Sequence, residues 1–257
     1  MERRGVLARL PASGRKANMQ MRFSDKVVLV AGGTGGLGRA VSLAFLEEGA
    51  KVVVTYRQQK EFDALKIEAG ANGSAIEGHC VDVTDETAVR QLLAKVLAEH
   101  GRLDALVNAV GAYAGGVNLW DLETKVFDQM LALNLRSGYA LLRAAIPAML
   151  KQKHGAIVNV ASKAALDHGA GAAAYAASKA AAVALMDSLA AEVKGTGVRV
   201  NSILPSIIDT EANRIAIAGA DFAKWPKPND IARVILFLCS DDARVIHGAA
   251  VPVYGDS

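Results

Sequence analysis

From residue 25 onward, short apolar runs alternate with longer segments in which apolar side chains recur at helical spacing. The apolar runs consist mostly of unbroken Val, Leu and Ile, a pattern typical of strands that are covered by helices on both faces. We predict strands at 26–31, 51–56, 74–81, 103–108, 156–161, 198–204 and 249–253. Helices are predicted between them at 36–48, 58–70, 85–100, 122–153, 172–194 and 228–240.

This alternation predicts an α/β fold: a doubly wound Rossmann-type domain with a mostly parallel seven-stranded sheet and right-handed crossovers. After residue 25 the sequence shows no linker, no change of composition and no internal repeat. Residues 25–257 are therefore expected to form one domain. Residues 1–24 are expected to be a flexible basic extension.

The composition excludes several classes of protein. Of the 257 residues, 52% are hydrophobic and 21% are charged, which is too apolar for a disordered chain. No uncharged apolar run reaches the roughly 18 residues of a membrane-spanning helix, and 5% aromatic residues are few for stacking on nucleic-acid bases. Cys80 and Cys239 lie in apolar segments without CxxC spacing, so we expect two buried free thiols and a reducing compartment, the cytoplasm.

The net charge of +3 is unevenly distributed. Residues 1–22 hold six basic side chains and one acidic one, whereas the rest of the chain carries 23 basic and 25 acidic side chains. The body is nearly neutral, so no nucleic-acid partner is expected. The basic head fits either a transit-type extension or a start codon read upstream of Met19 or Met21. We favour an untargeted or misassigned tail.

Glycines cluster between the first predicted strand and the first predicted helix, in Gly32-Gly33-Thr34-Gly35-Gly36-Leu37-Gly38. Glycine permits a sharp turn, close approach of the backbone to a pyrophosphate, and tight packing of helix on strand. The helix start then offers free N–H groups to phosphates. Such spacing also occurs in flexible turns, but its position at the first crossover favours a dinucleotide site.

A second candidate site is the segment Ala-Tyr-Ala-Ala-Ser-Lys at 174–179. Tyr175 and Lys179 are four residues apart, so they share one face of a predicted helix. An adjacent ammonium lowers the pKa of a phenol, which makes a tyrosine usable as an acid-base catalyst. Ser162, after the fifth predicted strand, is placed to hydrogen-bond a substrate oxygen. The alternative is a packed tyrosine beside a solvated lysine.

At this point the sequence resembles the short-chain dehydrogenase/reductase family, over residues 25–257, and the 3-oxoacyl-carrier-protein reductases within it. Ser162 lies thirteen positions before Tyr175, as in the family, and Asn134 matches the family's catalytic asparagine about forty positions before the tyrosine. Asn108 and Gly111 match the ends of the family's Asn-Asn-Ala-Gly segment. Further matches expected to bind the cofactor are Thr34, Leu37, Asp82, Val83, Pro205, Ile208 and Thr210.

The resemblance implies a mechanism for hydride transfer between a nicotinamide cofactor and a carbonyl or alcohol. Tyr175 is implied to exchange a proton with the substrate oxygen, and Ser162 to orient the carbonyl. Lys179 is implied to lower the tyrosine pKa and hold the cofactor ribose. Asn134 is implied to hold a water that links Lys179 to solvent.

The second predicted strand bears on the choice of cofactor. An enzyme that selects NAD usually ends this strand with an acidic residue for the ribose 2′-OH. Here that position is Tyr56, and the next residue, Arg57, is suited to clamp a 2′-phosphate. NADP(H) is therefore the expected cofactor, with NAD(H) and a solvated Arg57 as the alternative.

The chain departs from the family in ways that affect the cofactor site. The second Asn and the Ala of Asn-Asn-Ala-Gly are Ala109 and Val110 here, at positions that in the family support the fourth strand and the adenine pocket. Pro-Gly after the sixth strand is Pro205-Ser206, which predicts strain if that position needs positive φ. Asp-Gly-Gly near the C-terminus is replaced by Val253-Tyr254-Gly255.

Loops expected at the carboxyl ends of strands supply candidate pocket residues. These are Ala112, Tyr113, Asp167, His168, Ile207 and Ile208. Only residues 211–224 are available as a lid, which predicts an open site. The remaining histidines, at 79, 100, 154 and 247, have no metal-ligand spacing, and no metal is expected.

The sequence leaves two classes of function open: an NADPH-dependent carbonyl reductase, or a catalytically silent dinucleotide-binding protein. The intact Ser162, Tyr175 and Lys179 favour the enzyme, for which an NAD-linked alcohol dehydrogenase is the alternative. The alanine-rich face at 172–191 has simple packing on the sheet as one explanation. Because family members commonly associate through these helices, a homo-tetramer or homo-dimer is expected, without a membrane partner.

Overall fold

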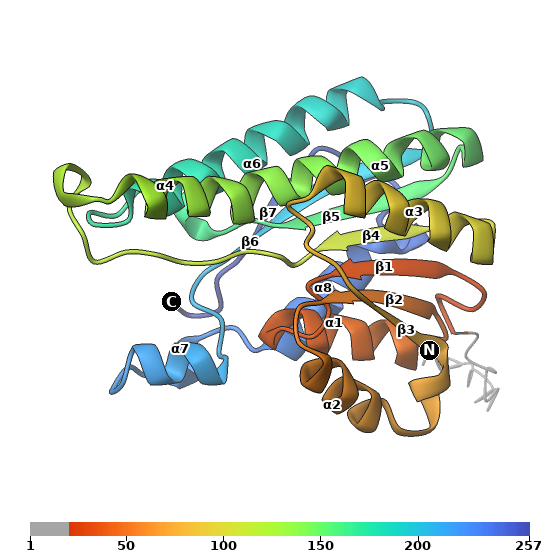
Figure 1. Cartoon of the computed structure of the whole chain (residues 1–257), viewed down its shortest axis with the longest axis horizontal. Coiled ribbons are helices and arrows are strands. Elements are labelled where there is room, and N and C mark those ends of the chain that lie inside the picture. Colours follow the sequence, from red (N-terminus) through yellow and green to blue (C-terminus); the bar gives the residue numbers. More distant parts are fainter. Residues whose placement is uncertain (1–20) are drawn as a thin grey trace, which may run out of the picture.

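The computed structural model describes residues 21–257, which form a parallel sheet of seven strands between two layers of helices (Figure 1). The strands pair in the order β3-β2-β1-β4-β5-β6-β7, and every pairing is parallel. The predicted Rossmann-type sheet is thus confirmed. The strands are β1 Val27–Ala31, β2 Lys51–Tyr56, β3 Ile76–Cys80, β4 Ala105–Asn108, β5 Gly155–Val160, β6 Val198–Pro205 and β7 Ala250–Val253.

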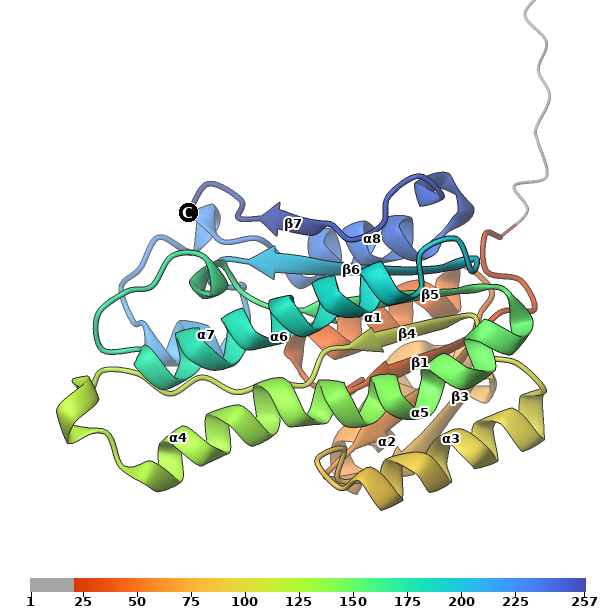
Figure 2. The same ribbon diagram turned by 90° about the horizontal axis from the view of Figure 1, so that it is seen from above.

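Helices cover both faces of this sheet (Figures 1 and 2). α1, α2 and α8 lie on one face, and α3, α5 and α6 lie on the other, with α4 leading into α5. Their bounds are α1 Gly36–Glu47, α2 Gln59–Ala69, α3 Glu86–His100, α4 Thr124–Leu131, α5 Ser137–Gln152, α6 Ala173–Glu192, α7 Glu211–Ala216 and α8 Pro228–Cys239. No helix of the described part is long and apolar enough to cross a membrane.

Strand β1 shows why the apolar runs are unbroken. All five of its residues are buried, and successive side chains point to opposite faces of the sheet. Val28 and Val30 belong to the core beneath α1 and α8, whereas Val27 and Leu29 belong to the core beneath α3, α5 and α6. A central strand of this sheet therefore needs apolar residues at consecutive positions.

The helix predicted at 122–153 is composite. α4 and α5 are joined by a π-helical turn, Ala132–Arg136, so the segment is continuous but not uniform. The prediction that both cysteines are buried is wrong for Cys80, which is exposed, whereas Cys239 is buried; both are free thiols. Cys80 ends β3, which lies at the edge of the sheet and has neighbours on one side only.

The prediction of a flexible extension at 1–24 lies mostly outside the described residues. Its last residues are part of the folded unit in the structure. Phe23 is buried and packs edge-to-face on Phe45 of α1, with ring centroids 4.8 Å apart. Arg22 pairs with Glu48.

The strand order places a topological switch beside β1. The chain moves from β1 outward to β2 and β3, then crosses back to β4 on the other side of β1. Loops that follow β1 and β4 therefore diverge at the carboxyl edge of the sheet. A crevice at such a switch point is where open α/β sheets bind their ligands.

Candidate active site

The glycine-rich loop after β1 is held tightly by its neighbours. Gly32 has φ +72°, and its N–H donates to Thr55 Oγ1 at 2.9 Å, which ties the loop to β2. A Cβ on Gly33 would lie 2.6 Å from the Val54 side chain, and one on Gly38 would lie 2.0 Å from the Gly32 carbonyl oxygen. Only glycine fits at these positions, so α1 packs closely on the sheet.

α1 begins directly after this loop, at Gly36. Its N-cap residue is Gly35, which has no side chain to accept hydrogen bonds from the first turn. The first N–H groups of a helix have no partner within the helix, and together with the helix dipole they favour an anion. The loop and helix start therefore fit the pyrophosphate of a dinucleotide, as the sequence predicts for Gly32, Gly36, Leu37 and Gly38.

Tyr175 and Ser162 come together at the carboxyl edge of the sheet. Tyr175 lies in the first turn of α6, and Ser162 follows β5. Burial raises the pKa of Tyr175, a hydrogen bond with the Ser162 side chain opposes that increase, and Tyr113 adds to it. The Ser162 hydroxyl also accepts from the Ala164 N–H at 3.1 Å, which fixes its position.

Lys179 lies one turn further along α6 and is buried. Its Nζ donates to the Val160 carbonyl at the end of β5, at 3.0 Å. Burial lowers the pKa of Lys179 to about 8. The influences on the pKa of Tyr175 are burial, Ser162 and Tyr113, and the lowering of that pKa by Lys179 stays a prediction.

Asn134 sits in the π-helical turn between α4 and α5. Its Nδ2 donates to the Ala112 carbonyl and to Ser178 Oγ, both at 3.0 Å, and its Oδ1 accepts from the Ala112 N–H at 2.9 Å. π-helical turns often occur at functional sites. Asn134 thereby connects the loop after β4 to α6, which carries Tyr175 and Lys179.

Gly111 lies where these groups meet. A Cβ there would be 2.9 Å from Asn134 Oδ1 and 3.0 Å from Lys179 Nζ. The predicted residue Asn108 stands at the base of the same loop. Its Nδ2 donates to Asn159 Oδ1 at 3.0 Å, and its Oδ1 accepts from the Val110 N–H at 3.2 Å. The sequence-predicted catalytic set is therefore gathered in one place.

The segment after β6 closes over the glycine loop. A Cβ on Gly36 would lie 2.9 Å from the Thr210 methyl group, so Thr210 packs directly on the start of α1. Thr210 also caps α7 by accepting from the Asn213 N–H at 3.3 Å, and the Ile208 carbonyl accepts from Asn213 Nδ2 at 2.8 Å. Pro205 is the buried last residue of β6.

The predicted strain at Ser206 is absent. Ser206 is not among the described residues with positive φ, so a non-glycine residue fits. Its hydroxyl instead donates to the Tyr254 carbonyl at 2.6 Å. Ser206, which stands where the family has glycine, thus adds a hydrogen bond to the segment after β7.

Two polar contacts, an ion pair and a hydrogen bond, lie near the end of β2. Arg57 pairs with Asp82 at 3.2 Å, and both side chains are largely exposed; the next residue, Val83, is buried. The Thr34 hydroxyl of the glycine loop donates to Glu61 Oε2 at 3.1 Å. Sequence reasoning did not identify Glu61; its position in the first turn of α2, directly after β2, is the signal that points to it.

The other predicted pocket residues divide into two groups. Ala112 and Tyr113 adjoin the catalytic set: Ala112 bonds Asn134, and the Tyr113 ring packs on Tyr175. His168 is exposed, and its ring nitrogen contacts the Ala165 carbonyl at 3.2 Å, within its own loop. Asp167 and Ile207 are also exposed or partly exposed on loops at this edge.

The short lid has a hollow of its own. α7 and the residues before it line a space of about 410 Å³, and Arg214 and Asp209 pair across it at 2.5 Å. The lid is thus braced by an ion pair, and its Ile215 and Ile217 side chains are exposed.

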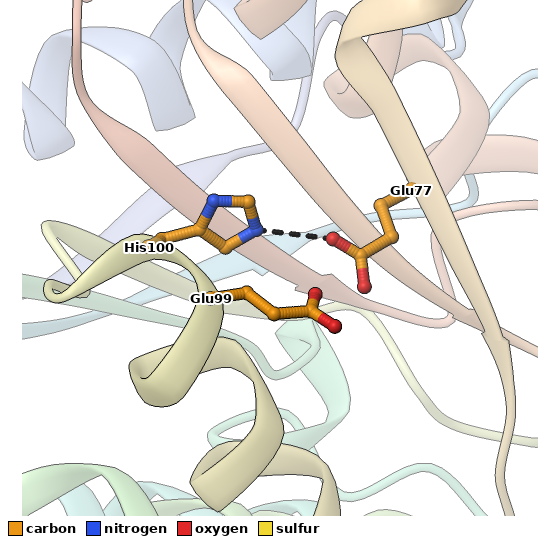
Figure 3. A group of neighbouring side chains, drawn as sticks. All are labelled: Glu77, Glu99 and His100. Atoms are coloured by element: carbon orange, nitrogen blue, oxygen red, sulfur yellow. Dashed lines mark hydrogen bonds and ion pairs between the residues drawn. The ribbon is translucent and has the colours of Figure 1, made fainter.

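Two histidines that the sequence left unassigned meet at the outer strand. Glu77 of β3 contacts His79. Its carboxylate is also hydrogen-bonded to His100 Nε2, at 3.0 Å (Figure 3). Glu99 lies beside them, and Lys95 Nζ is 4.0 Å from Glu77 and 3.7 Å from Glu99. Because Lys95 already supplies a cation here, we interpret the group as an ion-pair cluster, and the expectation of no metal stays a prediction.

Comparison with known proteins identifies what the chain is similar to. Residues 26–219 match the family model described as short chain dehydrogenase. The 3-oxoacyl-(acyl-carrier-protein) reductase FabG of Thermotoga maritima is 31% identical, over 91% of this chain and 98% of that protein. The meso-2,3-butanediol dehydrogenase of Serratia marcescens is 36% identical, over 91% and 95% respectively.

Solved structures give the same result. ElxO with NADP bound has a TM-score of 0.85 and 29% identity, over 90% of this chain and 97% of that one. An NAD+-bound xylitol dehydrogenase has a TM-score of 0.85 and 26% identity, over 91% and 99%. The resemblance predicted from the sequence is confirmed.

Proposed function

We propose that this chain, which belongs to the short-chain dehydrogenase/reductase family and is an NAD(P)-dependent oxidoreductase, transfers hydride between NADP(H) and a carbonyl or alcohol substrate. The observation that carries the proposal is the convergence of Tyr175, Ser162, Lys179 and Asn134 at the carboxyl edge of the sheet. The glycine loop beside them suits a dinucleotide, because α1 packs closely on the sheet there and its N-cap residue, Gly35, has no side chain over the first N–H groups of the helix.

The roles of the residues follow from their contacts. Tyr175 gives its proton to the carbonyl oxygen in reduction and takes it back in oxidation. A phenol whose pKa is raised holds its proton at neutral pH, and the Ser162 hydrogen bond opposes that increase. Ser162 also bonds the substrate oxygen and orients it. The cofactor supplies the hydride.

Lys179 and Asn134 support this proton transfer. With a pKa lowered to about 8, Lys179 is mostly protonated at neutral pH but able to exchange its proton. Asn134 holds the loop after β4 against α6 through its bonds to Ala112 and Ser178. We assign it the positioning of that loop and of a water between Lys179 and solvent.

The test of the reaction is Tyr175→Phe, which removes the transferable proton and keeps the ring. We expect turnover of ketones, aldehydes, quinones or acyl thioesters to fall by about 10²–10⁴-fold, while NADPH binding, followed by its fluorescence, changes less than about twofold. Tyr139→Phe, the same deletion on an exposed tyrosine of α5, is the matched control. Undiminished turnover in Tyr175→Phe would contradict the mechanism and would favour a protein that only binds dinucleotides.

NADP(H) as the cofactor is supported by Tyr56 in place of an acid and by Arg57 next to it. Arg57 is 66% exposed, and its partner Asp82 is also exposed, so the guanidinium can exchange that partner for a phosphate. We expect Arg57→Ala to lower kcat/KM with NADPH about tenfold or more, and to leave kcat/KM with NADH within about twofold.

One observation favours NAD(H) as a second candidate. The Glu61 carboxylate bonds Thr34 between β2 and the glycine loop, where it would accept from a ribose hydroxyl and repel a 2′-phosphate. Glu61→Gln keeps the size and removes the charge. If NADH is the cofactor, this variant gains activity with NADPH; if Arg57 determines the choice, wild type already prefers NADPH.

The substrate belongs to a broad class. The relatives include proteins named as 3-oxoacyl-(acyl-carrier-protein) reductase and as butanediol dehydrogenase, and these names describe different carbonyl and alcohol compounds. We propose a small carbonyl compound, because the lid is short and braced by Asp209 and Arg214. A screen of NADPH oxidation against the four carbonyl classes tests this.

We also propose a homo-tetramer or homo-dimer in the cytoplasm. α5 and α6 leave a hollow of about 340 Å³ between them, lined by Tyr139, Ile146, Leu185 and Leu189 among others. Apolar side chains at an exposed groove favour association. The two free thiols support a reducing compartment. If sedimentation equilibrium finds only monomer, the proposed association is wrong. If cell fractionation finds the protein outside the cytoplasm, the proposed location is wrong.

A further inference from the structure

Tyr113 is an exposed aromatic side chain in contact with the proposed acid. It lies in the loop after β4 and is 68% exposed. Its ring packs edge-to-face with that of Tyr175, with centroids 4.9 Å apart and an angle of 76° between the planes. Most of the Tyr113 residue is therefore accessible, directly beside the proposed acid.

The loop that carries Tyr113 is fixed on both sides of the ring. Asn134 bonds both the N–H and the carbonyl of Ala112, at 2.9 and 3.0 Å. On the other side, the Gly116 N–H donates to the Gly171 carbonyl at 2.9 Å, which joins this loop to the one before α6. Tyr113 is exposed, but its backbone is anchored to the catalytic elements.

The lack of a side chain at Gly115 leaves space for the Tyr113 ring. A Cβ on Gly115 would lie 2.2 Å from Tyr113 Oη and 2.6 Å from Cζ. The φ of Gly115 is not positive, so the requirement is for space and not for an unusual backbone. The ring thus folds back over its own loop, and a single methyl group at Gly115 would displace it.

Other loops at the same edge present apolar side chains. Leu166 follows the turn that begins at Ser162 and is 60% exposed, and Ile207 follows β6 and is 41% exposed. An apolar lining with few, well-placed polar groups is typical of a site for a small organic molecule. Exposed aromatic and aliphatic side chains on the loops at this edge of the sheet favour a ligand that is itself apolar.

We propose that Tyr113 forms the wall of the substrate site and selects flat, conjugated carbonyl compounds such as aromatic aldehydes, aromatic ketones or quinones. Aromatic rings attract one another in edge-to-face and offset-stacked arrangements, which a saturated ring cannot reproduce. A substrate ring held against Tyr113 directs its carbonyl toward Tyr175 and Ser162. Tyr113 acts by positioning and is not assigned a proton transfer; the inference rests on the proposed function.

The test compares two aldehydes of nearly equal size, benzaldehyde and cyclohexanecarboxaldehyde, with wild type and with Tyr113→Phe, Tyr113→Leu and Gly115→Ala. In wild type we expect the lower KM for benzaldehyde. Tyr113→Leu should raise that KM about tenfold, with kcat within about twofold and little change for the saturated aldehyde. Tyr113→Phe should keep the preference, and Gly115→Ala should reproduce the effect of Tyr113→Leu.

A pH profile separates positioning from general damage. Tyr113 contributes to the raised pKa of Tyr175, so the limb of the profile that belongs to Tyr175 should move to lower pH in Tyr113→Phe. Melting temperature and NADPH affinity should not change in any of the three variants.

The outcomes distinguish the two proposals. If both aldehydes lose activity equally in Tyr113→Leu, or if the preference survives, Tyr113 is not the wall and the inference is wrong. If wild type reduces no carbonyl compound while it still binds NADPH, the proposed function fails, and the inference fails with it.

Discussion

Both ends of the sheet bury a charged group, and the two groups differ in the partners that surround them. At the amino end, Asp104 is 4% exposed, accepts from the Val27 N–H at 2.9 Å and from Arg102 Nε at 2.6 Å, and has Lys26 at 3.5 Å. At the carboxyl end, buried Lys179 has the Val160 carbonyl as its partner, and among the described residues no carboxylate contributes to its pKa.

The directions of the pKa shifts express this difference. Burial acts to raise the pKa of Asp104, but hydrogen bonds from Arg102 and Val27 outweigh it, and the pKa is lowered. For Lys179 burial acts without an opposing charge and lowers the pKa to about 8. The amino end therefore stabilises its charge, whereas the carboxyl end keeps a charge that is costly to the fold and ready to exchange a proton.

The largest expected effect on stability is at the amino end. Asp104→Asn removes the charge that faces Lys26, Arg102 and His154, and we expect a loss of about 3–5 kcal/mol in the free energy of unfolding at pH 7. Because the folded pKa of Asp104 is lowered, its contribution is present above the unfolded pKa and is lost as the pH falls through the folded pKa. Urea titrations at neutral and acidic pH measure both effects.

The control for this variant is its affinity for the nicotinamide cofactor at low temperature, where the protein stays folded. It should match wild type, because Asp104 and the glycine loop lie at opposite ends of the sheet. A loss below about 1 kcal/mol would show that the amino end is not the stabilising one.

The next effect has the opposite sign. Lys179→Met removes a buried charge, and we expect activity to be lost while the free energy of unfolding rises by on the order of 3 kcal/mol at pH 7. The folded pKa of about 8 lies below the ordinary 10.5, so the wild-type cost is complete below pH 8 and fades as the pH rises to 10.5. The advantage of the variant should therefore shrink between pH 8 and pH 10.5 in matched denaturation curves.

An unchanged or lower stability of Lys179→Met at pH 7 would remove the contrast between the two ends. The conservative variant Lys179→Arg is a useful companion. It keeps a charge that cannot be given up, so we expect no gain in stability from it.

The smallest expected effect on stability concerns buried polar side chains on three neighbouring strands. Asn108, Asn159 and Ser202 are paired across β4, β5 and β6. Within residues 21–257, Asn159 Nδ2 and Ser202 Oγ are buried without a hydrogen-bond partner. Ser202→Ala removes one such group, and we expect a gain of about 1 kcal/mol, or about 2–4 °C in Tm.

Ser42→Ala is the matched control, because the Ser42 hydroxyl is equally buried but contacts the Gly33 and Gly38 carbonyls at 3.1 and 2.9 Å. It should lower Tm. If both variants move Tm in the same direction, the partner of the hydroxyl is not what decides the result.

The sequence predicts well what is local. Unbroken Val runs such as Val52–Val54 indicate central strands because their two faces are both covered, and the glycine spacing and the Tyr175–Lys179 pair lie within single segments. The spacing to Ser162 and Asn134 adds residues that a known family places at fixed distances. These predictions need no knowledge of contacts between distant segments.

Contacts across the fold are what the sequence leaves open. Glu61 meets Thr34 over 27 positions, and Asp104 meets Val27 over 77, so neither pairing is visible as a pattern. The π-helical turn within 122–153 is not visible in the sequence, because it differs from an α-helix in its backbone hydrogen bonds, which run from i to i+5, and not in a pattern of residue types. The exposure of Cys80 depends on the strand order, which composition does not determine.

That π-helical turn has an evolutionary consequence. A π-helical turn holds about one residue more than an α-helical turn, so loss of one residue within Ala132–Arg136 would restore a regular helix with α4 and α5 nearly in place and would move the side chains inside the turn. The amide of Asn134 would then leave both Ala112 and Ser178. A deletion of a single codon could therefore disconnect two loops at once, while the apolar pattern that builds the fold survived almost unaltered.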